Sequence, residues 1–339
     1  MKIELSTDKN EWENWLILQK YTEFLQSFAW GDFQKDVGRE VIRVNLEDKS
    51  GKVGQFQGIV HRPVPGLRYL YIPRPDKKTM ESLSTSWESD VKPFLKEQKI
   101  DFVRLEPGEP VSGLKLPKNI LTKNVQAHTT LVLDVTPEEG DLMLGMHSKT
   151  RYNIRLAKKK GVVVKQEKNL ETYWNLCQTT KTRDGFSTHP KSYYKKMLDL
   201  DFVIQLTAYF EDKPIVSNIC INYNKVFTYL HGASANQYRN VMAPYLVQWE
   251  AMLLAKSLGC THYDFWGVAP MIDKDAKRQQ TCFNNFCWQP DHKYTGFTRF
   301  KAGFGGEYKE YPQAMDLVLS PLKYKAYKFF RQVIRKLKK

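Results

Sequence analysis

The sequence predicts an α+β protein built from two similar domains, and three observations support this. The chain has 339 residues, more than a single hydrophobic core usually organises. Its composition, 42% hydrophobic and 13% aromatic, is that of a folded globular protein. Helical and β-like segments also follow one another in the same order twice along the chain, which indicates a duplication.

The first round begins with two helical segments. Possible N-caps at 6–8 precede apolar residues at helical spacing, and "FLQSFAWGDFQKDVG" then predicts a short helix that Gly38 ends. Glycine and proline clusters separate the β-like runs that follow, and 76–99 reads as one helix. The predicted strands are "EVIRVNLED", "GKVGQFQGIVHRPV", "LRYLYIPR" and, after the helix, "DFVRLEP".

The second round begins near residue 130 with the strand "HTTLVLDV". Thr136 is expected to cap a helix, with Pro137 at its first position and Glu139 completing a capping box. "HSKTRYNIRLAKKKG" predicts a basic helix that ends at Gly161. The remaining elements are the strand "VVVKQE", helices over 169–182 and 190–199, strands "FVIQLTAYFED", "KPIVSNICINY" and "KVFTYLHGAS", the helix "APYLVQWEAMLLAKSLG" and the strand "THYDFWGV".

The tail "SPLKYKAYKFFRQVIRKLKK" predicts a basic amphipathic helix. Its apolar residues recur at near-helical spacing: Leu322, Tyr324, Phe329, Phe330, Val333, Ile334 and Leu337. This stripe either packs on the first domain, leaving the lysines in water, or lies on an anionic membrane. We favour packing, and the two arrangements are compatible because the last lysines lie beyond the stripe.

Charge and cysteine content indicate the class of partner and the compartment. The net charge of +15 favours anionic partners such as nucleic acid, phosphate-bearing ligands or a membrane surface. The five cysteines form no CxxC pair, and their odd number and scattered spacing argue against a disulfide framework and fit a reducing cytoplasm. Cys282 and Cys287 near His292 match no common zinc spacing, so we expect no metal. The N-terminus lacks a signal core and no window of eighteen uncharged apolar residues occurs, which predicts a cytoplasmic chain.

Most catalytic signatures are missing, and the remaining candidates are basic and aromatic. "GFGG" at 303–306 is not a phosphate-binding loop, and neither G-x-S-x-G nor HExxH occurs. The basic helix predicted from "KTRYNIRLAKKKG" is either a solvated face or a phosphate site. "TYLHGASANQYRN" places Arg239 before a helix start, which suits an anionic group or is a plain junction. In "GFTRFKAGFGG", Lys301 lies between Phe300 and Phe304, as an active lysine or as a surface charge on a strand and turn.

Three long segments resemble the Fem family, the aminoacyl-tRNA-dependent transferases that build peptidoglycan interpeptide bridges. They are "HSKTRYNIRLAKKKGVVV", "YLHGASANQYRNVMAPYLVQWEAMLLAKSLGCTHYDFWGV" and "GFTRFKAGFGGEYKEYPQAMDLVL", and "QSFAWGDFQK" and "VRLEP" match upstream motifs. The resemblance implies two acetyltransferase-like (GNAT) domains with mixed sheets flanked by helices. The first is expected at 1–130, with 311–339 returning to it, and the second at 131–310. No heptad run of the required length occurs, so the chain is similar to members without a coiled-coil arm, one of which uses a UDP-linked muramyl-pentapeptide.

The resemblance also implies roles for individual residues. Phe300 and Lys301 match the catalytic Phe-Lys pair, and Glu106 matches an acidic residue near the acceptor amine. Tyr193 and Tyr229 match tyrosines around the precursor. Further substrate-binding candidates are Trp30, which lies in the N-terminal motif, and Arg239, which precedes a helix start.

Three positions depart from the family pattern. The lysine and arginine that contact nucleotide phosphates in the family fall on Gln34 and His189, for which Lys35 and Arg183 would substitute. A family tyrosine becomes His231. These departures leave room for a lipid-linked precursor, which would suit the basic tail and place the protein at the inner face of the membrane.

The predicted function is aminoacyl transfer from charged tRNA to the peptide-stem amine of a peptidoglycan precursor, either UDP-muramyl-pentapeptide or lipid II. The tRNA ester is already activated, so the reaction needs neither ATP nor a metal, and we expect no cofactor. We also expect the protein to be a monomer. Lys301 would stabilise the oxyanion, with Phe300 and Phe304 excluding water. Glu106 would orient or deprotonate the amine, or would be structural. The alternatives are an acyl-CoA-dependent N-acyltransferase and a non-catalytic tRNA-binding protein.

Overall fold

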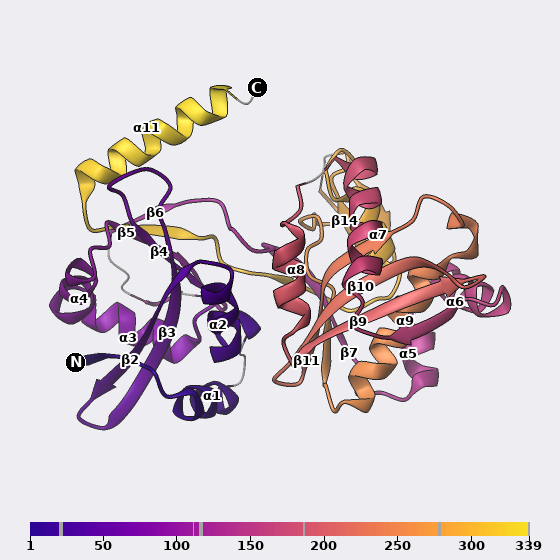
Figure 1. Cartoon of the computed structure of the whole chain (residues 1–339), viewed down its shortest axis with the longest axis horizontal. Helices are drawn as coiled ribbons and strands as arrows, with labels where there is room; N and C mark the ends of the chain where they lie inside the picture. Colours follow the sequence, from indigo (N-terminus) through magenta and orange to yellow (C-terminus); the bar gives the residue numbers. More distant parts are fainter. Residues whose placement is uncertain (20–22, 111, 115–117, 186, 277–278, 338–339) are drawn as a thin grey trace. The chain divides into compact units, whose positions relative to one another are not determined.

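The computed structural model describes all residues except 20–22, 111, 115–117, 186, 277–278 and 338–339. The chain forms two compact units (Figure 1). Unit 1 comprises Met1–His128 and Tyr311–Lys339, and unit 2 comprises Thr129–Glu310. In the described part of the chain, no helix combines the length and the apolarity that crossing a bilayer requires.

Each unit is a sheet flanked by helices. The elements of unit 1 are β1 (Lys2–Leu5), α1 (Lys9–Leu18), the 3-10 turn η1 (Phe24–Gln26), α2 (Phe28–Asp36), β2 (Glu40–Asp48), β3 (Gly51–His61), β4 (Tyr69–Pro73), α3 (Lys77–Ser86), the π-turn η2 (Trp87–Val91), α4 (Lys92–Glu97), β5 (Phe102–Glu106), β6 (Asn119–Leu121), β16 (Met315–Val318) and α11 (Pro321–Leu337). The elements of unit 2 are β7 (Thr129–Asp134), α5 (Glu139–Gly145), α6 (Ser148–Lys159), β8 (Val163–Gln166), α7 (Leu170–Asp184), α8 (Lys191–Leu198), β9 (Val203–Phe210), β10 (Lys213–Tyr223), β11 (Val226–Ser234), η3 (Arg239–Val241), α9 (Ala243–Ser257), β12 (His262–Asp264), β13 (Thr281–Phe283), β14 (Phe286–Trp288), α10 (Thr295–Ala302) and β15 (Glu307–Glu310).

The two sheets share their order of strand directions and the connections of their first five strands. Their strand orders are β1-β2-β3-β4-β5-β16-β6 and β8-β9-β10-β11-β12-β7-β15. The sixth place is taken by β16, the last strand of unit 1, and by β7, the first strand of unit 2. In each sheet one pair is parallel, β4 with β5 and β11 with β12, and the other pairings are antiparallel. Parallel neighbours need a crossover, and α3–α4 and α9 provide it. This order confirms the predicted repeat and the predicted fold class, α+β with mixed sheets flanked by helices.

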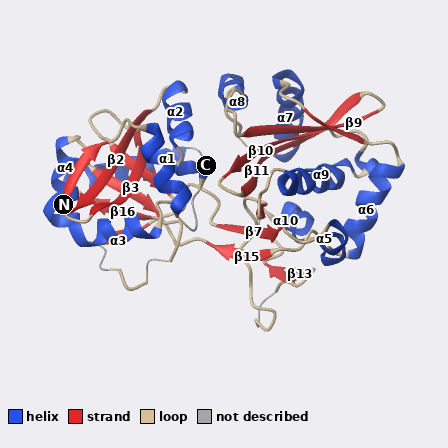
Figure 2. Cartoon of the chain, turned by 90° about the horizontal axis from the view of Figure 1, so that it is seen from below, coloured by secondary structure: helices blue, strands red, loops and turns tan. Residues whose placement is uncertain are grey.

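The faces of the unit 1 sheet follow the alternation of its sequence. Ile42, Val44 and Leu46 on β2 face an apolar core with residues of α3. The intervening side chains face the helical N-terminal segment: Arg43 donates to the Phe28 carbonyl at 2.6 Å, and Gln57 Nε2 donates to the Ser27 carbonyl at 2.7 Å. In unit 2, α7 and α8 cover one face of the sheet and α9 the other (Figure 2).

Several predicted boundaries were wrong. The helix over 76–99 is two helices joined by a π-turn, because Pro93 near the start of α4 cannot donate a backbone hydrogen bond. Helix α5 begins at Glu139 because the Thr136 hydroxyl bonds to Asp134 instead of capping. "GFTRFK" lies mainly in helix α10, not in a strand. The strand predicted from "THYDFWGV" ends at Asp264, where the chain turns.

The predicted packing of the tail stripe is also largely wrong. Among the described side chains of the stripe, only Tyr324 is buried, and with Tyr327 it packs against Phe102. The exposed apolar residues of α11 are Leu322, Phe329, Phe330, Val333 and Ile334. The side chains of Arg335 and Leu337 and residues 338–339 lie outside the described residues.

Candidate active site

Lys301 lies on the inner face of α10. The buried residues of this helix are Thr298, Lys301 and Ala302, which share one face because they are three and four positions apart. The Thr298 hydroxyl accepts a hydrogen bond from the Ala269 amide at 2.8 Å, which fixes this face against the segment that follows β12. Lys301 itself is only 7% exposed, so the alternative of a surface charge is excluded.

The ammonium of Lys301 is held by backbone carbonyls at the end of β12. It donates to the Gly267 carbonyl at 2.7 Å and to the Trp266 carbonyl. Trp266 and Gly267 both adopt left-handed backbone conformations, with φ of 48° and 73°. The Trp266 amide donates to Asp264 at 2.8 Å, which fixes the turn. A tryptophan in this conformation is strained, and such strain is typical of functional sites.

The position of Lys301 changes its protonation. Burial lowers the pKa of Lys301 to about 7, and the nearby charge of Asp264 opposes this shift. The rings that flank the ammonium are those of Tyr229 and Phe297, each 5.4 Å away. In the described part of the chain two of the three ammonium hydrogens have partners, so one remains for a substrate oxygen.

Strand β11 diverges from β12 beside this lysine. The two strands pair from Val226 to Thr228, and β11 then continues past the end of β12. A bulge at Leu230 interrupts the pairing of β11 with β10, since Ile219 pairs with His231 but Cys220 pairs with Tyr229. The divergence leaves room for the Tyr229 ring, which lies against Gly232: a Cβ on this glycine would be 1.9 Å from the tyrosine hydroxyl.

Gly232→Ala is therefore expected to displace the Tyr229 ring from the lysine. The overlap with the tyrosine hydroxyl cannot be relieved without moving that ring or the strand. We expect the transfer reaction that the sequence predicts to slow at least about tenfold, since small displacements in a site are costly. The measurement is the transfer rate beside that of Gly140→Ala, whose added methyl meets nothing within 4 Å. Equal rates for the two variants would contradict the placement of Tyr229.

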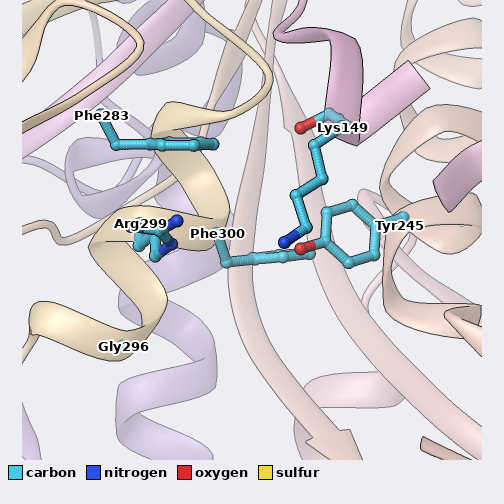
Figure 3. A pocket seen from close by; sticks show the side chains of 7 residues that line it. Lys149, Tyr245, Phe283, Gly296, Arg299 and Phe300 are labelled. Carbon is cyan, nitrogen blue, oxygen red and sulfur yellow. The ribbon is translucent and has the colours of Figure 1, made fainter. Parts of the chain in front are cut away.

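A pocket of about 140 Å³ opens beside Phe300 (Figure 3). Its lining residues are Lys149, Thr150, Tyr245, Phe283, Gly296, Arg299 and Phe300. Figure 3 shows the Lys149 ammonium beside the Tyr245 hydroxyl and the Phe300 ring. The Arg299 guanidinium lies 4.4 Å from the centre of the Phe283 ring. The pocket thus combines two cations with three aromatic rings.

Phe300 and Lys301 serve different surroundings although they are adjacent in sequence. Phe300 packs edge-on against Tyr245, with ring centres 4.9 Å apart, and Phe304 packs 5.5 Å from Phe265. The predicted shielding of Lys301 by Phe300 and Phe304 is corrected: Tyr229 and Phe297 are the rings beside its ammonium. Helix α10 therefore lines the pocket with Phe300 and carries Lys301 on its buried face.

Three of the predicted precursor-binding residues come together around β11 and α8. His189 stacks on Tyr193 with ring centres 3.9 Å apart, and His231 lies 6.4 Å from His189. Burial lowers the pKa of His231 to about 4, with a smaller contribution from His189. His231 is therefore neutral near pH 7 and offers an aromatic edge and not a charge.

The predicted replacements for the phosphate contacts, Arg183 and Lys35, and the candidate Arg239 differ in their surroundings. Arg183 pairs with Asp184 at 2.7 Å and donates to Ser234 and Asn236, so its charge is already compensated. Arg239 lies in the exposed turn η3. In unit 1, Lys35 is exposed, 3.9 Å from Asp32.

The other predicted residues of unit 1 are buried in structural contacts. Trp30 packs edge-on against Phe24, and Gln34 accepts a hydrogen bond from Arg39. Glu106 is fully buried and accepts hydrogen bonds from the Tyr71 hydroxyl at 2.6 Å and from the Gln126 amide at 3.1 Å. These contacts favour the structural role of Glu106, and its catalytic role stays a prediction.

The sequence argued against disulfides, and this prediction is wrong for one pair of cysteines. Cys282 and Cys287 form a disulfide across the β13–β14 hairpin, where their Cα atoms are 4.1 Å apart. The turn residues Asn284 and Asn285 both have positive φ, as a two-residue hairpin requires. A search for CxxC spacing misses such a pair, because residues i and i+5 face each other across a two-residue turn. The hairpin carries Phe283, so the disulfide braces one wall of the pocket.

Comparisons with known proteins identify the family of the chain. The model of the FemAB family matches residues 114–202 and 200–332. The chain is 24% identical to the lipid II:glycine glycyltransferase of Staphylococcus epidermidis, with 75% of this chain and 82% of the relative covered. The enzyme of the same name from Staphylococcus aureus is 22% identical over the same shares. The predicted class of enzyme, an aminoacyltransferase, agrees with these names.

Solved structures share the fold. The crystal structure of FemX superposes with a TM-score of 0.78 over 96% of this chain and 99% of that one, at 18% identity. A more distant likeness is L-PGS from Bacillus licheniformis, with a TM-score of 0.53 at 11% identity over 92% of each chain. The family match, the relatives and the repeated sheet lead to one conclusion: the chain belongs to the FemAB family.

Proposed function

We propose that the protein transfers an aminoacyl group from charged tRNA to the peptide-stem amine of a lipid-linked peptidoglycan precursor. The observation that carries the proposal is the buried Lys301, whose ammonium is fixed by two carbonyls and retains one hydrogen for a substrate. The names of the relatives support lipid II as the acceptor. The lack of a cation at Gln34 and His189 agrees with an acceptor that has no nucleotide.

In the proposed reaction the acceptor nitrogen attacks the ester carbonyl carbon of the aminoacyl group. The carbonyl oxygen becomes an oxyanion, and the third N–H of the Lys301 ammonium donates a hydrogen bond to it. The bond between the carbonyl carbon and the ribose oxygen then breaks, and that oxygen leaves as a hydroxyl with a proton from the attacking amine. The product is an amide, and the energy comes from the ester, so no further reactant is required.

The pocket beside Phe300 fits the end of the donor RNA. Lys149 and Arg299 provide positive charge for phosphates, and the rings of Phe283, Tyr245 and Phe300 can stack on bases. Helix α10 lines the pocket with Phe300 and carries Lys301 at the next position. An RNA terminus held in the pocket would therefore bring its ester close to the ammonium.

Mass analysis of a transfer reaction tests the proposal. The protein is incubated with a mixture of charged tRNAs and either lipid-linked or UDP-linked pentapeptide, and the acceptors are then analysed by mass spectrometry. We expect the lipid-linked acceptor to gain the mass of an amino-acid residue, with at least tenfold less transfer to the UDP-linked one. Acetyl-CoA is the control donor. Acylation from acetyl-CoA would instead favour an N-acyltransferase, and tRNA binding without any transfer would favour a non-catalytic protein.

A further inference from the structure

Helix α11 carries an apolar surface that the rest of unit 1 leaves open. Phe329 and Val333 are four positions apart, as are Phe330 and Ile334, so these residues form two neighbouring rows on one side. Phe329 is 63% exposed, and the other three are between 37% and 46% exposed. In Figure 1 the second half of α11, drawn in yellow, stands clear of the sheet of unit 1. Four large apolar side chains side by side in water are unusual for a surface helix.

A different side of α11 fixes the helix to unit 1. Tyr324 and Tyr327 are 5% and 4% exposed and pack against Phe102, with ring centres 5.1 and 5.0 Å away. The Tyr324 hydroxyl donates to Asp316 at 2.9 Å, and Lys323 pairs with Asp101 at 2.9 Å. The attachment therefore uses the first turns of the helix, and the described residues of unit 1 leave the apolar rows exposed.

The charges of α11 identify what covers those rows. The helix has 17 residues and no acidic one, and its basic residues are Lys323, Lys325, Lys328, Arg331, Arg335 and Lys336. At 100° per residue, Lys325 and Lys336 lie beside the row of Phe329 and Val333, while Lys328 lies on the polar side. A second copy of the same helix would bring like charges together. A membrane with anionic headgroups would take both the apolar rows and the lysines.

We propose that α11 docks the protein on the surface of an anionic lipid bilayer, with Phe329, Phe330, Val333 and Ile334 inserted at the headgroup boundary. The lysines beside them contact lipid phosphates, while Tyr324 and Tyr327 keep unit 1 attached. Docking would bring the enzyme to the membrane in which a lipid-linked acceptor resides. The lipid interaction does not depend on the proposed transfer, because it requires no acceptor.

Cosedimentation of the full chain with vesicles tests this docking. One set of vesicles consists of phosphatidylcholine alone, and the other of equal parts of phosphatidylcholine and phosphatidylglycerol. Neither set contains a peptidoglycan precursor. We expect binding to the anionic vesicles that weakens as salt is added. Phe329→Ser with Phe330→Ser should lower the affinity by more than about tenfold, because two exposed rings no longer insert.

Two further variants separate the apolar and electrostatic contributions. Lys325→Glu with Lys336→Glu should lower binding to anionic vesicles by about tenfold or more and leave the weak binding to phosphatidylcholine unchanged. The matched control is Ile17→Ser with Leu18→Ser, two exposed apolar residues of unit 1 on α1, which should bind as the parent does. The proposal is overturned if the phenylalanine variant binds like this control. It is also overturned if that variant abolishes a concentration-dependent dimer in a chain that binds no vesicles.

Discussion

Replacing Lys301 by methionine is expected to slow aminoacyl transfer by a factor of about 10²–10³, the loss typical of a removed oxyanion donor. Methionine keeps most of the side-chain length and suits a buried position, but it places no charge and no hydrogen at the substrate oxygen. The measurement is the single-turnover rate from pre-charged tRNA to a lipid-linked acceptor. Lys293→Met, an exposed lysine of the preceding loop, is the matched control. An unchanged rate for Lys301→Met would remove the lysine from the mechanism.

The pKa of Lys301 gives the same prediction a pH dependence. With a pKa of about 7 in the folded protein, the ammonium is present below pH 7 and is lost as the pH rises through 7. The contribution of Lys301 to the transfer rate should therefore decline above pH 7, and the ratio of parent to Lys301→Met rates should decline with it. A ratio that stays constant from pH 6 to pH 9 would contradict an active ammonium.

Unfolding measurements test the burial of this lysine without reference to activity. In the unfolded chain a lysine titrates near its ordinary pKa, about 10.4. Between pH 7 and that value the unfolded state therefore holds a proton that the folded state lacks. The free energy of unfolding should rise with pH across this window in the parent, and Lys301→Met should lack that part of the rise.

Asp316→Ala is expected to destabilise unit 1 by about 3–5 kcal/mol. Arg104 Nε and Nη2 donate to the two carboxylate oxygens of Asp316, each at 2.8 Å, and the two side chains are 6% and 1% exposed. Without the carboxylate, the guanidinium stays buried and uncompensated. The measurement is the urea midpoint of unfolding.

Two controls define the origin of that loss. Glu88→Ala breaks the exposed pair with Lys92 and should cost only about 0.5 kcal/mol. Asp316→Ala combined with Arg104→Met should be less destabilised than Asp316→Ala alone, since the uncompensated charge is gone. If the double variant lost the sum of the two single effects, the ion pair would not be the cause.

The sequence predicted the parts of the fold that follow from periodicity. Alternation in "EVIRVNLED" places Ile42 and Val44 on the core face, and the repeated order of elements identified the duplication. The helix α10 was missed because its buried face contains a lysine, so its pattern reads as polar. Lys149, Arg299 and Tyr245 were not assigned to one pocket because they come from three separate helices. Proximity of this kind depends on packing, to which local sequence contributes little.

The candidate site was predicted as single residues but not as an arrangement. The family resemblance identified Lys301 and Tyr229, and the structure places the Lys301 ammonium 5.4 Å from the centre of the Tyr229 ring. It gave no indication that Trp266 and Gly267 turn their carbonyls toward the ammonium, because that depends on two left-handed residues after a short strand. The substitution of His231 for a tyrosine acquires a physical meaning only from its burial, which keeps the imidazole neutral.

The strand order of unit 1 also affects how the chain folds while it is being made. Strand β16 lies between β5 and β6 in that sheet, yet it is translated after all of unit 2. On the ribosome, the N-terminal part of the chain therefore waits with β6 lacking its neighbour and the core lacking Met315 and Leu317. The second unit is contiguous and can close its sheet first. The half of the protein that is synthesised first is thus the last to be completed.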